Sequence, residues 1–304
     1  MYWFPVTLLT ALAAAIGDVF MKARFAHMSP GRMAVVRATS PFPFLLPFFL
    51  AVPWPETDPV FWQTLAVLVP FEIAALVLYM RALKVSPLSL SIPFLAFTPT
   101  FVLMTGWLVL GEQVTGAGMA GVLLTVMGAY VLYMDSWNMT FLAPFRAFAR
   151  EEGARLMLGV AAIYSLTSVL GKKAVQHSSP LFFACFYFLL LAFVTPVVLW
   201  IFSLMLDRIR PGANFIGPVC PIRKGGSFAW TAWGTVGFFQ AFMVICHMWA
   251  INIVAAAYMI AVKRTSLFFS VIFGKLVFDE EKVPQRLTGT GLMVTGVGLI
   301  VIYA

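Results

Sequence analysis

The residues best suited to chemistry are two adjacent cations, Lys263 and Arg264, in an otherwise apolar segment, 255–278. Lys263 lies about four residues, roughly 6 Å along a helix, from the middle of that segment. Charges at such a depth are costly to bury unless they face a partner, a cavity or water. With the hydroxyls of Thr265 and Ser266, they are suited to hold a carboxylate or phosphate. The residues of this segment that we expect to bind a ligand are Tyr258, Lys263, Arg264, Thr265 and Ser266.

Two alternatives to ligand binding stay open for this cationic pair. The first is internal pairing with Glu72 and Asp18, two acids inside apolar segments whose charges would balance the pair. In the second, Arg264 extends along its stem toward the end of its segment. Pairing and ligand binding are compatible if the ligand displaces an acid.

The two acids are themselves candidate functional residues. Glu72 lies near the middle of the segment 60–80, where a carboxyl group could bind a ligand or relay a proton. Its alternative role is a structural hydrogen bond or a salt bridge to the cations. Asp18 lies four residues before Lys22, a spacing that favours local pairing on one helix.

Four further residues are candidates for lining or closing a cavity. Pro93 and Pro99 fall in the apolar segment 88–110, and each removes a backbone donor and disturbs a helix. Freed carbonyl groups are tolerated where they line a cavity, so we expect a bent cavity helix or gate, with an ordinary kink as the alternative. Tyr79 and His247 occupy equivalent positions near segment ends, where either is a gate residue or a structural one.

Composition indicates the environment of these residues. Of the 304 residues, 62% are hydrophobic and 11% are charged, and the mean hydropathy is +0.94. A soluble protein carries about a quarter charged residues. The chain is therefore expected to be an integral membrane protein and not a soluble domain, a disordered chain or a nucleic-acid binder. Its three cysteines have no paired spacing, and we expect neither a metal nor a cofactor.

Apolar runs between polar breaks predict ten membrane-spanning helices, each about 20 residues long. They lie near 3–22, 34–52, 60–80, 88–110, 114–134, 155–174, 181–205, 229–250, 255–278 and 287–303. The nine tryptophans all fall within a few residues of a span end, where such rings prefer to lie. The predicted fold class is an all-α integral membrane protein.

Loop charges predict the orientation of the chain. If loops alternate between sides, one side holds sixteen of the twenty Lys and Arg residues, Arg37 among them. The other side holds only Lys172 and Lys173, which either attract an anion or belong to the scaffold, while Lys263 and Arg264 lie within a span. Because basic loops stay in the cytoplasm, both termini are expected on the non-cytoplasmic side of the cell membrane.

The two halves of the chain repeat each other. Lys22, His27, Ser29 and Pro30 recur 150 residues later as Lys172, His177, Ser179 and Pro180. Matches 168 residues apart are Trp62 with Trp230, Ala82 with Ala250, Glu112 with Glu280, Gly121 with Gly289, and Gly128 with Gly296. With five spans in each half, the second copy enters the membrane from the opposite side. This inverted repeat is typical of secondary transporters, whose binding sites lie near the midplane between the repeats.

The repeat sets the expected domains. They are a first five-helix repeat at 1–134, a cytoplasmic linker at 135–154 that could form an interfacial helix, and a second repeat at 155–304 with an inserted loop at 207–227. The first-half equivalents of Lys263 and Arg264 are Leu95 and Ala96. The cationic pair is therefore not part of the shared scaffold.

On these motifs the sequence resembles the drug/metabolite transporter superfamily, in the form that has two EamA repeats. The resemblance rests on the lysine ending the first span of each half, the acid closing the fourth and the glycines of the fifth: Lys22 and Lys172, Glu112 and Glu280, Gly121 and Gly128, Gly289 and Gly296. It implies ten helices, a central cavity and alternating access for metabolites or amphipathic compounds.

The expected function is secondary-active transport, not enzymatic turnover. The substrate is expected to be a small metabolite or amphipathic compound that bears an anionic group. Alternatives are a multispan membrane enzyme and a flippase acting on a phosphorylated lipid carrier. The expected partners are the substrate and the lipid bilayer, with no nucleic acid, and a homodimer stays open.

Overall fold

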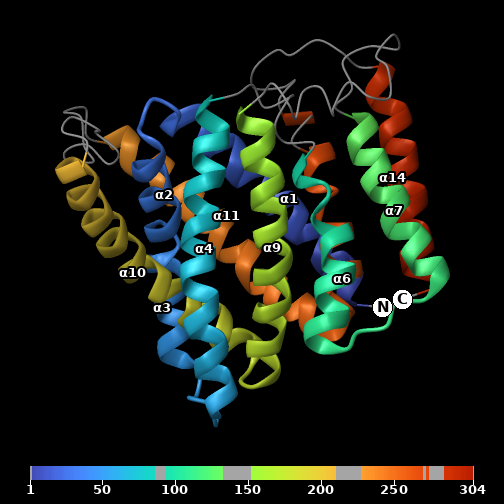
Figure 1. Ribbon diagram of the computed structural model, residues 1–304, viewed down its shortest axis with the longest axis horizontal. Coiled ribbons are helices and arrows are strands. Elements are labelled where there is room, and N and C mark those ends of the chain that lie inside the picture. The colour runs from blue at the N-terminus through green and yellow to red at the C-terminus, as the bar shows by residue number, and fades with distance from the viewer. Residues whose placement is uncertain are drawn as a thin grey trace.

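The computed structural model describes residues 2–85, 94–132, 152–209, 227–269, 272–273 and 284–303, and these residues are almost entirely helical. The helices, shown in Figure 1, are α1 (Trp3–Phe25), α2 (Pro30–Thr39), α3 (Phe42–Ala51), α4 (Pro59–Val85), α6 (Thr98–Leu110), α7 (Gly116–Leu132), α9 (Glu152–Gln176), α10 (Pro180–Ile209), α11 (Ser227–Ile253), α12 (Ala256–Lys263) and α14 (Pro284–Tyr303).

The observed helices correspond one by one to the ten predicted spans. Helices α2 and α3 together form the second span, Pro30–Ala51, and α12 is the described helix of the ninth. Within the described residues, six spans are long and apolar enough to cross a membrane, and three shorter apolar helices accompany them. The predicted all-helical membrane fold is therefore confirmed.

The repeated Ser-Pro motif begins the second span of each half. In the first half the Ser29 hydroxyl accepts a hydrogen bond from the Arg32 backbone N–H at 3.4 Å, and Pro30 occupies the first turn of α2. In the second half the Ser179 hydroxyl accepts from the Phe182 N–H at the same distance. A serine cap followed by proline is a strong local signal for a helix start.

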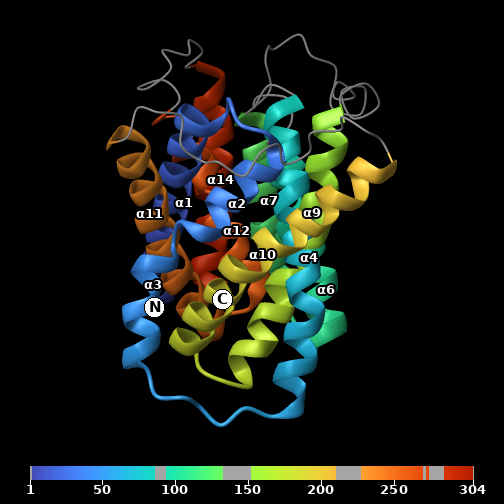
Figure 2. The ribbon, with the colours of Figure 1, turned by 90° about the vertical axis from the view of Figure 1, so that its left-hand side faces the viewer.

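The two halves are interleaved and do not lie side by side as separate bundles. The first span of each half packs on the third span of the other, which gives the pairs α1 with α11 and α9 with α4. The remaining spans also pair across the halves, as α2 with α10, α6 with α12 and α7 with α14 (Figures 1 and 2). Each second, fourth and fifth span thus packs on its own counterpart, while the first and third spans exchange partners between the halves. This is the arrangement expected for an inverted repeat.

Glycines allow α7 and α14 to approach each other closely. A Cβ atom added at Gly121 would lie 2.8 Å from the carbonyl oxygen of Gly296, and one added at Gly296 would lie 2.6 Å from that of Gly121. Such backbone contact between helices is characteristic of small residues in membranes. The glycines that the sequence singled out therefore hold two helices of one chain together.

Several predicted features lie outside the described residues. These are Pro93, most of the linker 135–154 and most of the inserted loop 207–227.

The two ends of the chain lie on the same face of the bundle (Figure 1).

Candidate functional site

The ninth span is interrupted at the cationic pair. Helix α12 ends at Lys263, Arg264 and Thr265 form a turn, and helical structure resumes at Ser266. At the turn, the Thr265 N–H donates to Val262 O and the Leu267 N–H donates to Arg264 O, both at 3.0 Å. These bonds span three residues where an α-helix spans four.

The fourth span has a matching interruption. Ala96 and Phe97 form a turn directly before α6, and the Phe97 N–H donates to Phe94 O at 3.2 Å. Ala96 is 168 residues before Arg264, so the two turns are equivalent by the repeat. Pro99 lies in the first turn of α6, where a proline fits, and does not kink a longer helix there. Two interrupted spans thus pack on each other, α6 against α12.

Arg264 reaches across this crossing into the other half. Its Nη2 donates to the Thr98 hydroxyl at 2.8 Å, and that hydroxyl donates to Leu95 O at 2.7 Å. Arg264 is only 9% exposed and Thr98 is fully buried. The alternative in which Arg264 extends toward the membrane interface is therefore wrong. Its Nε is buried without a hydrogen-bond partner among the described residues.

Lys263 contacts His247, the residue that the repeat makes equivalent to Tyr79. Its ammonium group donates to Nδ1 of His247, on α11, at 3.2 Å. In the described part of the chain, no carboxylate lies within 4 Å of Lys263 or Arg264. The internal ion pairs with Glu72 and Asp18, considered from the sequence, are therefore not formed in this structure.

Asp18 pairs with a cation that the sequence analysis placed in a loop. Its Oδ1 accepts from Nη1 of Arg37 at 2.6 Å, and its Oδ2 accepts from the Tyr79 hydroxyl at 3.3 Å. Arg37 lies in the last turn of α2, well inside the span. Counting Arg37 as a loop charge was wrong, and the ion pair that the structure shows for Asp18 joins α1 to α2. The signal was present, because Arg37 falls inside the predicted span 34–52.

Glu72 faces the same interior from the middle of α4. Its carboxyl group interacts with Thr167 on α9, and its charge acts on Lys263 and Arg37. The charge of Glu72 also acts on Tyr164 of α9 and Tyr187 of α10. The side chain is partly exposed although its neighbours come from four other helices. The carboxyl group of Glu72 therefore lies among groups from several helices without being fully buried.

These residues form one group that we call the central polar cluster. Its members are Asp18, Arg37, Glu72, Tyr79, Tyr164, His247, Lys263 and Arg264. Three members are cations and two are acids, so at formal charge, with a neutral histidine, the cluster has one excess positive charge. When Arg37 is placed in a loop, as the sequence suggested, the charges of Lys263, Arg264, Glu72 and Asp18 sum to zero.

Tyr258, Thr265 and Ser266 were also predicted on the ninth span, and their surroundings differ. The Tyr258 hydroxyl accepts from the Thr115 N–H at 3.2 Å and lies against Gly118, so it joins α12 to α7 outside the cluster. The Thr265 hydroxyl donates to Val262 O at 2.8 Å within the turn itself. Ser266 is buried where the helix resumes.

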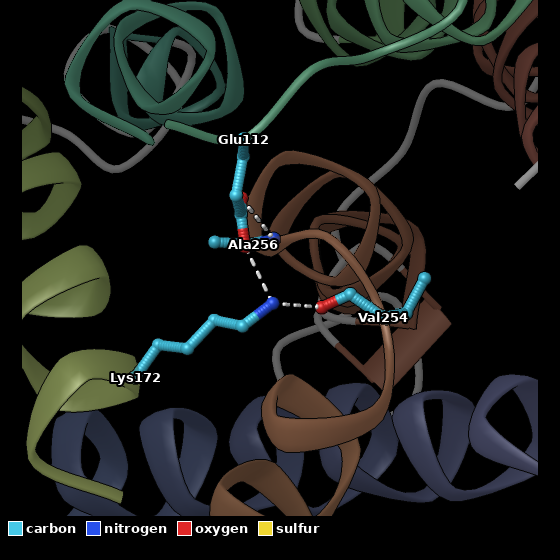
Figure 3. Close-up of polar contacts among 4 residues, drawn as sticks. All are labelled: Glu112, Lys172, Val254 and Ala256. Atoms are coloured by element: carbon cyan, nitrogen blue, oxygen red, sulfur yellow. Dashed lines mark hydrogen bonds and ion pairs between the residues drawn. The ribbon is translucent and has the colours of Figure 1, made fainter. Parts of the chain in front are cut away.

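A second buried polar group joins the two halves, and we call it the inter-half tie. Lys172, at the end of α9, donates to Glu112 Oε1 at 2.5 Å and to Val254 O at 2.6 Å (Figure 3). The other oxygen of Glu112 accepts from the Ala256 N–H at 2.9 Å, at the first residue of α12. Of the two roles considered for Lys172, these contacts favour the scaffold one, because the ammonium group is buried and already paired with a carboxylate inside the protein.

No metal centre is formed by these side chains. Among the described residues, no group of three or more His, Cys, Asp and Glu side chains is arranged to hold a metal ion.

The fold and the cluster together define a class of protein. Two inverted halves, two interrupted spans that cross, and a charged cluster at their crossing are the features of a membrane carrier. The sequence profile of the EamA-like transporter family matches residues 1–134 and 152–302. The chain belongs to this family, within the drug/metabolite transporter superfamily, and is a multi-pass membrane transporter. The two matched segments are consistent with two EamA repeats.

One solved structure supports the fold alone. A protein of known crystal structure, 15% identical in sequence, superposes with a TM-score of 0.70, covering 99% of this chain and 96% of its own. The search of curated proteins gave no match.

Proposed function

We propose that this chain is a secondary-active carrier, located in the cell membrane, that moves a small monoanion with an apolar body by alternating access. The observation that carries the proposal is the excess positive charge of the central polar cluster, which lies where two interrupted spans cross. One bound monoanion would bring the cluster to neutrality. Carriers with inverted repeats bind their substrates at such crossings.

The state of Arg264 supports an anionic ligand. A guanidinium group has five N–H donors, and among the described residues its one hydrogen bond is to Thr98. Leaving a buried donor unpaired is costly, and a charge-assisted bond to an anion would remove that cost. Lys263, next in sequence and held by His247, is placed to share the same anionic group.

The surroundings of the cluster support an apolar body on the substrate. The rings of Tyr79 and Tyr164 lie with their centroids 6.4 Å apart beside the charged groups. Tyr187, whose hydroxyl is buried without a hydrogen-bond partner among the described residues, lies near Glu72. Aromatic rings of this kind present apolar faces and polar tips to a ligand.

Glu72 is the candidate for coupling transport to a proton. It is the acid of the cluster without a cation within 4 Å among the described residues, and it is partly exposed. Carboxyl groups inside membrane spans commonly serve as proton relays in pumps and transporters. Glu72→Gln should abolish proton-driven accumulation of substrate while leaving exchange of substrate across the membrane measurable.

The test is transport by the purified protein in proteoliposomes. Benzoate is a suitable probe because it is a monoanion with an apolar ring, and inorganic phosphate and a phosphorylated lipid serve as comparisons. We expect saturable uptake of unmodified benzoate. Arg264→Gln and Lys263→Gln should each reduce uptake at least tenfold, whereas Lys173→Gln, a matched loss of charge at the end of α9, should not.

The outcomes separate the candidate functions. Unchanged uptake in both cluster variants would remove the anion-binding role of Lys263 and Arg264. Movement of the phosphorylated lipid without benzoate uptake would favour a flippase. Chemical conversion of the probe would favour a membrane enzyme.

A further inference from the structure

The pair formed by Asp18 and Arg37 suggests a further role for both residues. We propose that Asp18 is an internal counter-ion that occupies Arg37 in the empty transporter and is displaced by the carboxylate of the substrate. Arg37 is then a third anion-binding residue, and the substrate is a monocarboxylate. This inference rests on the proposed function and names the chemical class of its substrate.

Few hydrogen bonds hold Asp18 and Arg37 together, which favours replacement of Asp18 by another carboxylate. Nη1 of Arg37 donates to one oxygen of Asp18, and in the described part of the chain this is the hydrogen bond of the guanidinium group. A strongly held Arg–carboxylate pair is bidentate, with two parallel N–H···O bonds. The second oxygen of Asp18 accepts from Tyr79 at 3.3 Å, which is long for an O–H···O bond.

The inter-half tie offers a contrast within the same chain. There both oxygens of Glu112 are bound and the ammonium group of Lys172 has two acceptors. The side chains of that tie are 8% and 14% exposed, whereas those of Arg37 and Asp18 are 13% and 31% exposed. Both oxygens of the acid are bound in the inter-half tie, whereas among the described residues Arg37 donates one hydrogen bond and Asp18 is the more exposed acid.

Arg37 also interacts electrostatically with the cationic pair and its acidic neighbours. Its charge acts on Lys263 and on Glu72, and the charge of Asp18 acts on both Lys263 and Arg264. Asp18 therefore already lies within the field of all three cations. A substrate carboxylate in the place of the Asp18 side chain would have the same shape and charge. The group that Arg37 binds now therefore indicates the group that it would bind on the substrate.

The repeat shows that this pair is particular to one half. The residues 150 positions after Asp18 and Arg37 are Ser168 and Tyr187, neither of them charged at neutral pH. The pair is thus not required by the shared five-helix scaffold. Lys263 and Arg264 likewise have no charged equivalents in the other half. The charged pair of each half is therefore absent from the repeat partner.

The experiment is benzoate binding to the purified protein in nanodiscs, measured by calorimetry. Removing the internal competitor in Asp18→Asn should lower the dissociation constant for benzoate about tenfold. Arg37→Gln should raise it about tenfold, and the double variant should bind no more tightly than Arg37→Gln. Arg81→Gln, which removes an exposed arginine at the end of α4, is the matched control and should bind like the wild type.

A second variant guards against misfolding of Asp18→Asn. Tyr79→Phe removes the long hydrogen bond to Asp18 without changing any charge, and it should tighten benzoate binding about threefold. Weaker binding in both Asp18→Asn and Tyr79→Phe would overturn the proposal, because Asp18 would then position Arg37 and not compete with substrate.

The result also distinguishes this inference from the proposed function. If the wild type binds benzoate through Arg264 while Asp18→Asn and Arg37→Gln leave the dissociation constant unchanged, only the counter-ion proposal fails. If neither the wild type nor Asp18→Asn binds benzoate, the monoanion carrier and the counter-ion fail together.

Discussion

The inter-half tie gives the sharpest prediction for the stability of this transporter. Replacing Lys172 with methionine keeps the length of the side chain but removes its charge and both of its hydrogen bonds. Among the described residues, the carboxylate of Glu112, 14% exposed, would keep only the bond from the Ala256 N–H. Breaking one partner of a buried ion pair costs about 3–5 kcal/mol, because the other charge stays buried without compensation.

That cost is large enough to measure as a change in melting temperature. At about 2–4 °C for each kcal/mol, Lys172→Met should lower the melting temperature by roughly 5–20 °C. The assay is thermal unfolding of the detergent-solubilised protein, followed by tryptophan fluorescence. Lys173→Met is the matched control, since the neighbouring lysine is partly exposed, and it should melt within a few degrees of the wild type.

A double variant separates the charge from the packing. Lys172→Met combined with Glu112→Leu removes both charges, and apolar replacement of a buried pair is often nearly neutral. The double variant should therefore melt above Lys172→Met alone. If Lys172→Met melts like the wild type, or if the two substitutions simply add, the tie does not hold α6, α9 and α12 together as argued.

Three further predictions follow from the packing, the surface and the orientation. Gly121→Leu should destabilise the protein severely, because even a Cβ atom meets the Gly296 backbone at 2.8 Å, whereas Gly291→Leu, with open space at its Cβ, should be tolerated when both are compared by thermal unfolding and size-exclusion chromatography. Arg81→Gln breaks an ion pair whose side chains are 50% and 45% exposed, so it should change the free energy of unfolding by less than about 1 kcal/mol. A reporter fused after Ala304 that is active only outside the cytoplasm should give signal, and activity of a cytoplasmic reporter there would reverse the predicted orientation.

Hydropathy and the repeat were sufficient to predict the fold. Ten apolar runs gave ten spans because a helix that crosses lipid must satisfy its backbone internally and present apolar side chains outward. The repeated Ser-Pro motifs marked real helix starts at Pro30 and Pro180. The interleaving of the halves was not predicted, because nothing in the order of apolar residues indicates which spans of opposite halves pack together.

The candidate site was only partly accessible from the sequence. Lys263 and Arg264 stood out because charge inside an apolar run is costly, and the structure places them at the crossing of two spans. Arg37 was missed because the charge count assigned it to a loop although it lies within a predicted span. Tyr258 was expected with the cationic pair, yet its hydroxyl faces Thr115. Direction around a helix cannot be read where every face is apolar.

Interruption of the ninth span was also beyond the sequence. The residues next to Arg264 and Thr265 include no proline or glycine that would indicate a helix break. The partnership of Glu112 with Lys172 was hidden for another reason. Both were recognised as repeated motif residues, but they lie 60 positions apart and belong to different halves. Only the assembled bundle shows that one motif residue binds the other.

The exchange of helices between halves constrains how the chain can be made. When the ribosome has delivered α1, α4, α6 and α7 to the membrane, their main packing partners have not yet been synthesised, because these are α11 for α1, α9 for α4 and α6, and α14 for α7. The early segments must wait in lipid with small and polar faces uncovered. The bundle can therefore assemble only after the second half has been inserted. A nascent chain that ends after its first half is expected to be degraded by membrane proteases.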